Sequence, residues 1–168
     1  MFGVYSVLRI AGKVLQVALV CSLVGPLSFA IGQLLPRDRF DYRRFPYRPL
    51  GFELSGKLYR RLKVQWWKDR APDMSKIVRG VFKKKLNMKW DHAYIEELVR
   101  ETCVAEFVHY MLMLASPVFL FLLDGWEGVA AMAAYAVCNL PFVIIQRYNR
   151  PRLVMIMERK AARRTSKG

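Results

Sequence analysis

The chain has 168 residues, of which 54% are hydrophobic, and 28 Lys and Arg against 13 Asp and Glu give a formal net charge of +15. Its apolar residues form long blocks instead of the short periods of a soluble core, which indicates a membrane protein. Eighteen basic residues lie between positions 36 and 105 and eight between 147 and 168. This distribution fits membrane orientation and anionic lipid headgroups, so we exclude a nucleic-acid partner.

Residues 1–35 are predicted to be an N-terminal transmembrane anchor. The apolar stretch from Val14 to Leu35 is long enough to cross a hydrocarbon core of roughly 30 Å. An alternative is that residues 1–30 are a signal peptide cleaved after "SFA" at Ser28–Ala30. Cleavage would leave the basic middle segment outside the cell, against the positive-inside rule, so the uncleaved anchor is preferred.

Residues 36–90 form a basic, aromatic-rich segment that is expected to lie at the cytoplasmic membrane interface. Lys57–Arg70 is predicted to be one amphipathic helix, and a solvated basic linker is the alternative. Its proposed apolar face contains Leu58, Leu62, Gln65 and Trp66. A shorter helix is expected after Asp73, and Asp91 is a second candidate N-cap.

Residues 91–150 are predicted to hold a long helix and a transmembrane hairpin. From His92 no Pro or Gly interrupts the chain before Pro117, so one helix is expected to continue into the second span, residues 107–123. The acidic turn "DGWEG" at 124–128 separates it from the third span, residues 129–145. Pro151 is expected to stop this last helix, which leaves residues 151–168 as a basic cytoplasmic tail.

The fold class is therefore an all-α integral membrane protein with about three transmembrane helices and an interfacial amphipathic segment. The positive-inside rule places the large loop and the C-terminus in the cytoplasm of a multi-pass protein of the cell membrane. Cys21, Cys103 and Cys138 are odd in number and widely spaced, which gives neither a disulfide framework nor a zinc signature. The oligomeric state stays open.

The entrance to the second span carries the first candidate catalytic residues. At 100° per residue, Glu101, Glu106 and His109 lie on one helical face. Ionisable groups that enter a membrane are costly and usually face protein or a water-filled cavity. We expect His109 to be a general base, Glu106 to orient it and Glu101 to be a reserve carboxylate. The alternative is that Glu106 and His109 only hydrogen-bond each other at the interface.

The third span supplies a second polar face with Asn139 and Gln146. Counting from the turn places Gln146 level with Glu106, and Asn139 about 6 Å deeper than His109. Asn139 and Gln146 are expected to stabilise an oxyanion. The basic residues that follow are expected to bind the phosphates of acyl-CoA as co-substrate. These residues are Arg147, Arg150 and Arg152. No bound cofactor or metal is expected, because Glu106-x-x-His109 lacks the second such pair of a di-iron bundle.

Short motifs in the second half of the chain resemble the glycosyl-4,4′-diaponeurosporenoate acyltransferase family. They are "WK" at 67–68, "ET" at 101–102, "AE" at 105–106, His109, Asn139, Pro141 and "QRYNRPRL" at 146–153. The resemblance implies a membrane acyltransferase that moves a fatty acyl group from a donor to a glycolipid, such as a glycosylated carotenoid acid. The competing hypothesis is a non-enzymatic scaffold or anionic-lipid-binding module in a biosynthetic complex. A transporter is less favoured, because three short spans enclose little path.

Overall fold

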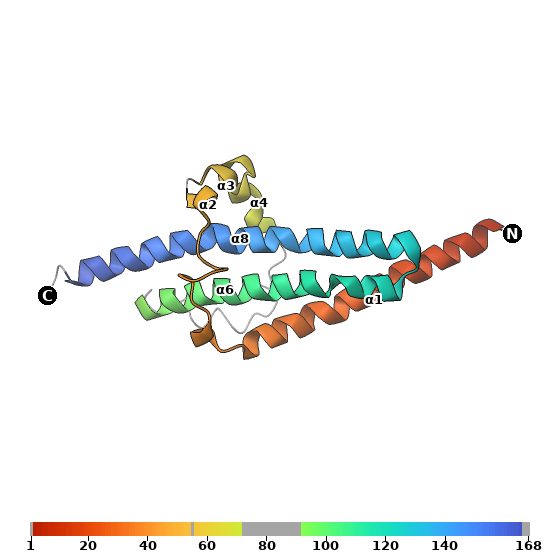
Figure 1. The fold of residues 1–168 in the computed structure, drawn as a ribbon, viewed down its shortest axis with the longest axis horizontal. Coiled ribbons are helices and arrows are strands. Elements are labelled where there is room, and N and C mark those ends of the chain that lie inside the picture. The colour runs from red at the N-terminus through yellow and green to blue at the C-terminus, as the bar shows by residue number, and fades with distance from the viewer. Residues whose placement is uncertain (1, 55, 72–91, 166–168) are drawn as a thin grey trace. The chain divides into compact units, whose positions relative to one another are not determined.

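The computed structural model describes residues 2–54, 56–71 and 92–165, and all regular elements in these ranges are helical (Figure 1). Three helices are long and apolar enough to cross a membrane: α1 (Phe2–Leu34), α6 (His92–Ala115), which α7 extends to Leu122, and α8 (Gly125–Thr165). The prediction of an all-α protein with three spans is confirmed. The candidate helix starts at Asp73 and Asp91 lie outside the described residues. The chain divides into two compact units.

The first unit contains Met1–Leu34 and Val108–Leu140. It holds α1, the end of α6, the 3-10 turn η3 (Ser116–Val118), α7 (Phe119–Leu122) and the start of α8. The hairpin turn is shorter than predicted, because the positive φ of Gly125 (56°) reverses the chain and α8 begins at that residue. Gly128 therefore lies within the helix. A Cβ atom on it would lie 2.5 Å from the carbonyl oxygen of Leu123, so the two helices meet closely here.

The second unit contains Leu35–Phe107 and Pro141–Gly168. In it η1 (Arg37–Arg39), α2 (Gly51–Leu54), α3 (Lys57–Arg61), α4 (Val64–Trp67) and η2 (Lys68–Arg70) accompany the start of α6 and the second half of α8. The short helices α2, α3 and α4 gather beside α8 (Figure 1).

The predicted single helix over Lys57–Arg70 is wrong, because Lys63 has a left-handed backbone (φ 49°) that separates α3 from α4. The face that becomes buried is also different from the predicted one. Tyr59 and Val64 are buried and pack with Tyr148 of α8, whereas Trp66 is 71% exposed. The break rotates α4 relative to α3, so a face counted at 100° per residue does not continue across it.

The prediction that Pro151 stops the last helix is also wrong. Both Pro141 and Pro151 lie inside α8, which continues to Thr165. A proline inside a helix removes one backbone hydrogen bond. Side chains on both sides of Pro151 are held by tertiary contacts: Tyr148, Arg150 and Met157 are all buried. These contacts outweigh the lost hydrogen bond, and the first part of the predicted tail is helical.

Candidate active site

Arg147 of α8 is the centre of a buried ionic network in the second unit. Its Nε and Nη2 donate to the two carboxylate oxygens of Glu53, at 2.8 and 2.6 Å. Its Nη1 donates to Glu106 Oε1 at 2.7 Å and to the carbonyl oxygen of Pro46 at 2.9 Å. One guanidinium thus joins α2, α6 and the chain before α2. Two-point pairing of this kind fixes geometry as well as charge.

Arg150 completes the network from the next turn of α8 and is only 2% exposed. It donates to Glu106 Oε2, to the hydroxyl of Thr102 at 2.8 Å and to the carbonyl oxygen of Tyr47 at 2.6 Å. Glu106 is completely buried and accepts from both arginines. A buried carboxylate is tolerated only with such partners.

Glu53 was missed as a functional candidate, although it is the only acidic residue between Asp41 and Asp69 in a strongly basic segment. The absence of other acidic residues around Glu53 is the feature of the sequence that could have identified it as a candidate. Burial alone would raise the pKa of its carboxyl group. Hydrogen bonds from Arg147, Tyr59 and the Leu50 backbone N–H outweigh burial and lower this pKa to about 2. Glu53 is therefore ionised at neutral pH.

Glu101, the predicted reserve carboxylate, lies half-buried on α6 and is paired with η1. Its oxygens accept from Arg37 Nε at 2.8 Å and from Arg37 Nη2 at 3.2 Å. Arg37 also donates to the carbonyl oxygen of Leu35 at 2.5 Å. The pair fixes the chain that follows α1 onto α6, so it has a clear structural use within the second unit.

His109 and Asn139 meet in the first unit, where His109 Nδ1 lies 2.8 Å from Asn139 Oδ1. Asn139 Nδ2 donates to the carbonyl oxygen of Tyr135 at 2.9 Å. Because that carbonyl can only accept, the Asn139 amide is oriented with Oδ1 toward the imidazole. His109 Nδ1 must then carry the hydrogen, and in the neutral ring Nε2 carries the lone pair. This is the tautomer that a general base acting through Nε2 requires.

The predicted depth of Asn139 is corrected by this hydrogen bond. Counted from position 129, Asn139 was expected about 6 Å deeper than His109. Because α8 begins at Gly125, four residues earlier, a count from that residue places Asn139 level with His109. The same count moves Gln146 four residues, about 6 Å, away from the level of Glu106. The buried face of α8 includes Asn139, Val143 and Arg150, whereas Gln146, the other member of the predicted polar face, is half-buried.

The structure therefore places the predicted residues in two groups. Glu106, Arg147 and Arg150 belong to the ionic network of the second unit, and His109 with Asn139 belongs to the first. Gln146 is half-buried, and Arg152 is exposed with its guanidinium carbon 3.5 Å from the centre of the Tyr148 ring. The convergence of all these residues on one site stays a prediction. Within the described ranges, no group of three His, Cys, Asp or Glu side chains could hold a metal ion.

The family model and the curated relatives that match this chain carry the same name. The model of the glycosyl-4,4′-diaponeurosporenoate acyltransferase family matches residues 41–159. The protein of that name from Staphylococcus aureus strain MRSA252 is 30% identical over 156 residues, covering 89% of this chain and 93% of its own. The same protein from strain Newman is 29% identical and covers 90% of this chain and 96% of its own. No solved structure matches the chain.

The match includes every predicted site residue, from Glu101 to Arg152, together with Glu53. Because this family and the matched relatives are named as acyltransferases, the match favours an enzyme over a non-enzymatic scaffold. The chain is an acyltransferase that belongs to the glycosyl-4,4′-diaponeurosporenoate acyltransferase family.

Proposed function

We propose that this acyltransferase moves a fatty acyl group from acyl-CoA to a hydroxyl of a glycosylated carotenoid acid at the cell membrane. The names of its relatives support the acceptor, since those proteins are named for a glycosyl diaponeurosporenoate. Three apolar helices suit an acceptor that is itself dissolved in lipid. The basic residues outside the spans favour a cytoplasmic position of the large loop and C-terminus, on the side where acyl-CoA is found.

The observation that carries the mechanism is the His109–Asn139 hydrogen bond. In the proposed step, His109 Nε2 takes the proton of the sugar hydroxyl while that oxygen attacks the thioester carbonyl carbon. The tetrahedral intermediate then collapses: the carbon–sulfur bond breaks, the ester remains, and the imidazolium returns its proton to the CoA thiolate. Asn139 keeps the imidazole in the required tautomer throughout.

The buried ionic network has a supporting part in this proposal. Glu106, paired with two arginines, holds α6 against α8 in the second unit. Arg147 and Arg150 are turned inward to that carboxylate, whereas Arg152 is exposed and is the member of the predicted set best suited to meet a donor phosphate. The roles of Glu106 in orienting His109 and of Asn139 and Gln146 at the oxyanion stay predictions.

The test compares the two histidines of the chain. Purified protein in lipid nanodiscs is supplied with labelled palmitoyl-CoA and a glycosylated carotenoid acid, and the acylated product is measured. His109→Ala should lower turnover by about a hundredfold or more, as loss of a general base does. His92→Ala, which removes the histidine at the start of α6, is the matched control and should keep most of the activity. Asn139→Leu should lower turnover less than His109→Ala, because it removes only the group that orients the base.

Two results would contradict the proposal. If His109→Ala retains turnover within a few-fold of the wild type, His109 is not the base. If the wild-type protein transfers no acyl group from acyl-CoA but does so from another fatty acyl donor, the proposed donor is wrong.

A further inference from the structure

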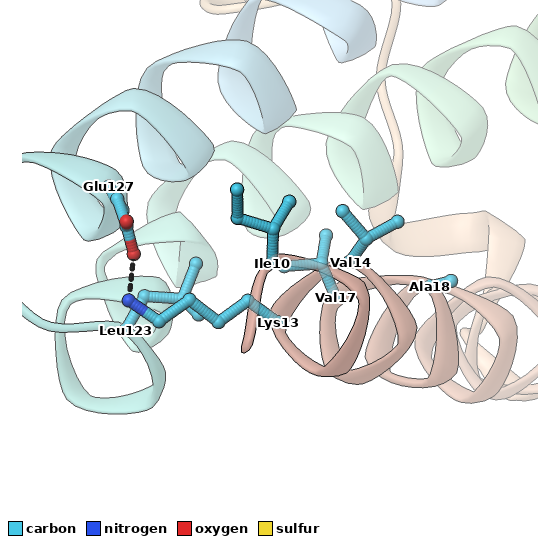
Figure 2. A pocket seen from close by; sticks show the side chains of 7 residues that line it. All are labelled: Ile10, Lys13, Val14, Val17, Ala18, Leu123 and Glu127. Atoms are coloured by element: carbon cyan, nitrogen blue, oxygen red, sulfur yellow. Dashed lines mark hydrogen bonds and ion pairs between the residues drawn. The ribbon is translucent and has the colours of Figure 1, made fainter. Parts of the chain in front are cut away.

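A cavity of about 460 Å³ opens between α1 and the hairpin turn in the first unit. This volume is in the range of small-molecule sites, roughly 300–1,000 Å³. Figure 2 shows that its wall is mainly apolar. The apolar residues of this wall are Ile10, Val14, Val17 and Ala18 of α1 with Leu123 of the turn.

One end of the cavity is marked by an ion pair. Lys13 of α1 and Glu127 of α8 both line the cavity and bind each other, as the dashed line in Figure 2 shows. Both side chains are partly exposed, at 25% and 44%. A charged pair at this position limits how far an apolar ligand can extend beyond the turn, because apolar groups gain nothing from contact with it.

The axial separation between the cavity and His109 is comparable to the length of an acyl chain. Glu127 precedes Asn139 by twelve residues of α8, which is about 18 Å along the helix axis, and Asn139 is hydrogen-bonded to His109. One leaflet of a hydrocarbon core roughly 30 Å thick holds acyl chains that extend about 15 Å. A long acyl chain with its carbonyl group at His109, directed along α8 toward the turn, would therefore have its far end at the axial level of the cavity.

We propose that this cavity receives the distal part of the donor's fatty acyl chain and so selects the length of the transferred group. The proposal rests on the proposed function, since it takes His109 as the reacting end. Selection is steric, because surrounding lipid is as apolar as the cavity wall and burial alone does not favour one chain length. The space between the His109–Asn139 level and the Lys13–Glu127 pair then decides which chains fit.

The experiment compares variants in which the cavity is narrowed or widened. Ala18→Trp fills it, Val17→Ala enlarges it, and Leu15→Trp is the control, because Leu15 lies on α1 and does not line the cavity. Nanodisc-embedded protein receives an equimolar mixture of lauroyl-, myristoyl-, palmitoyl- and stearoyl-CoA with one acceptor, and the acyl groups of the products are identified by mass spectrometry.

The expected result is a change of product profile. Ala18→Trp should lower the ratio of stearoyl to lauroyl product by about tenfold or more, as steric exclusion from a shaped apolar site does. Val17→Ala should raise that ratio, and Leu15→Trp should leave it unchanged. The opposite responses of Ala18→Trp and Val17→Ala also separate the effect from general misfolding.

The proposal is overturned if the wild type is active and both cavity variants give its product profile. A titration of the acceptor with palmitoyl-CoA alone identifies the other occupants. Variants that change only the acceptor concentration needed for half-maximal rate overturn the proposal and assign the cavity to the carotenoid acceptor. Variants that change neither this concentration nor the product profile also overturn it and assign the cavity to ordinary bilayer lipid. Loss of transfer by the wild type with every acyl-CoA is a different outcome, because it refutes the proposed function itself.

Discussion

Replacing Glu53 by Gln tests whether the ionic network stabilises the protein through the charge of this carboxylate. The variant keeps the shape and one carbonyl acceptor but removes the charge that pairs with Arg147. Lowering the pKa of Glu53 from 4.5 to about 2 corresponds to about 3 kcal/mol, at about 1.4 kcal/mol per tenfold change in the dissociation constant. This agrees with the roughly 3–5 kcal/mol lost when one partner of a buried pair is removed. A loss of about 3 kcal/mol corresponds to a fall of roughly 6–12 °C in the unfolding midpoint.

The pH dependence of the stability difference between wild type and Glu53→Gln tests the same role of charge, and its direction follows from the lowered pKa of Glu53. Because the pKa of Glu53 is lowered in the folded state, its stabilisation is complete above pH 4.5 and is lost as the pH falls through about 2. The difference in unfolding midpoint between wild type and Glu53→Gln, measured in a non-ionic detergent, should therefore be large at neutral pH and shrink across this window. Glu158→Gln, at an exposed position of α8, is the matched control and should follow the wild type. A difference that stays constant from pH 7 to pH 2 would refute the role of charge.

Two further substitutions test the packing of each unit by the unfolding midpoint. Gly128→Ala should lower the free energy of unfolding by about 1–3 kcal/mol, because its Cβ would lie 2.5 Å from the Leu123 carbonyl oxygen. Gly12→Ala is the control and should not destabilise the protein, because its Cβ would meet nothing within 4 Å. Equal midpoints for the two variants would contradict the close approach at Gly128. Thr102→Val should lower the free energy of unfolding by about 1–3 kcal/mol, because it leaves the buried Nε of Arg150 without its hydroxyl acceptor. Thr102→Ser keeps the hydroxyl and should retain most of the wild-type stability. If Thr102→Ser is as unstable as Thr102→Val, the hydroxyl is not the stabilising group.

The transmembrane helices could be predicted because their signal is local. A long apolar stretch has few alternatives to spanning a membrane, and the face shared by Glu101, Glu106 and His109 follows from helical periodicity alone. In the structure Glu106 is buried, and Glu101 and His109 are half-buried. Counting residues from the turn predicted that Asn139 lies about 6 Å deeper than His109. The structure places the two side chains at the same level, because α8 begins at Gly125.

The contacts that sequence reasoning missed depend on backbone angles or on distant partners. No apolar periodicity predicts that Lys63 has a left-handed backbone. This break in the helix nevertheless determines that Tyr59 and Val64 are the buried residues. The pairing of Glu53 with Arg147 joins positions 94 residues apart, and no local pattern specifies which of many arginines meets this carboxylate. Pro151 was misjudged for the same reason, since tertiary contacts around it override its local preference.

The Glu53–Arg147 pair also has a consequence for the order of biogenesis. Ribosomes make Glu53 and Glu106 before Arg147 and Arg150, so both carboxylates exist in the nascent chain before either α8 arginine that pairs with them. A chain truncated between α6 and Arg147 would carry two carboxylates without these arginines, one of them on a candidate membrane span, where an unpaired charge is costly. The ionic network of the second unit can therefore form only after the chain has been synthesised as far as Arg150.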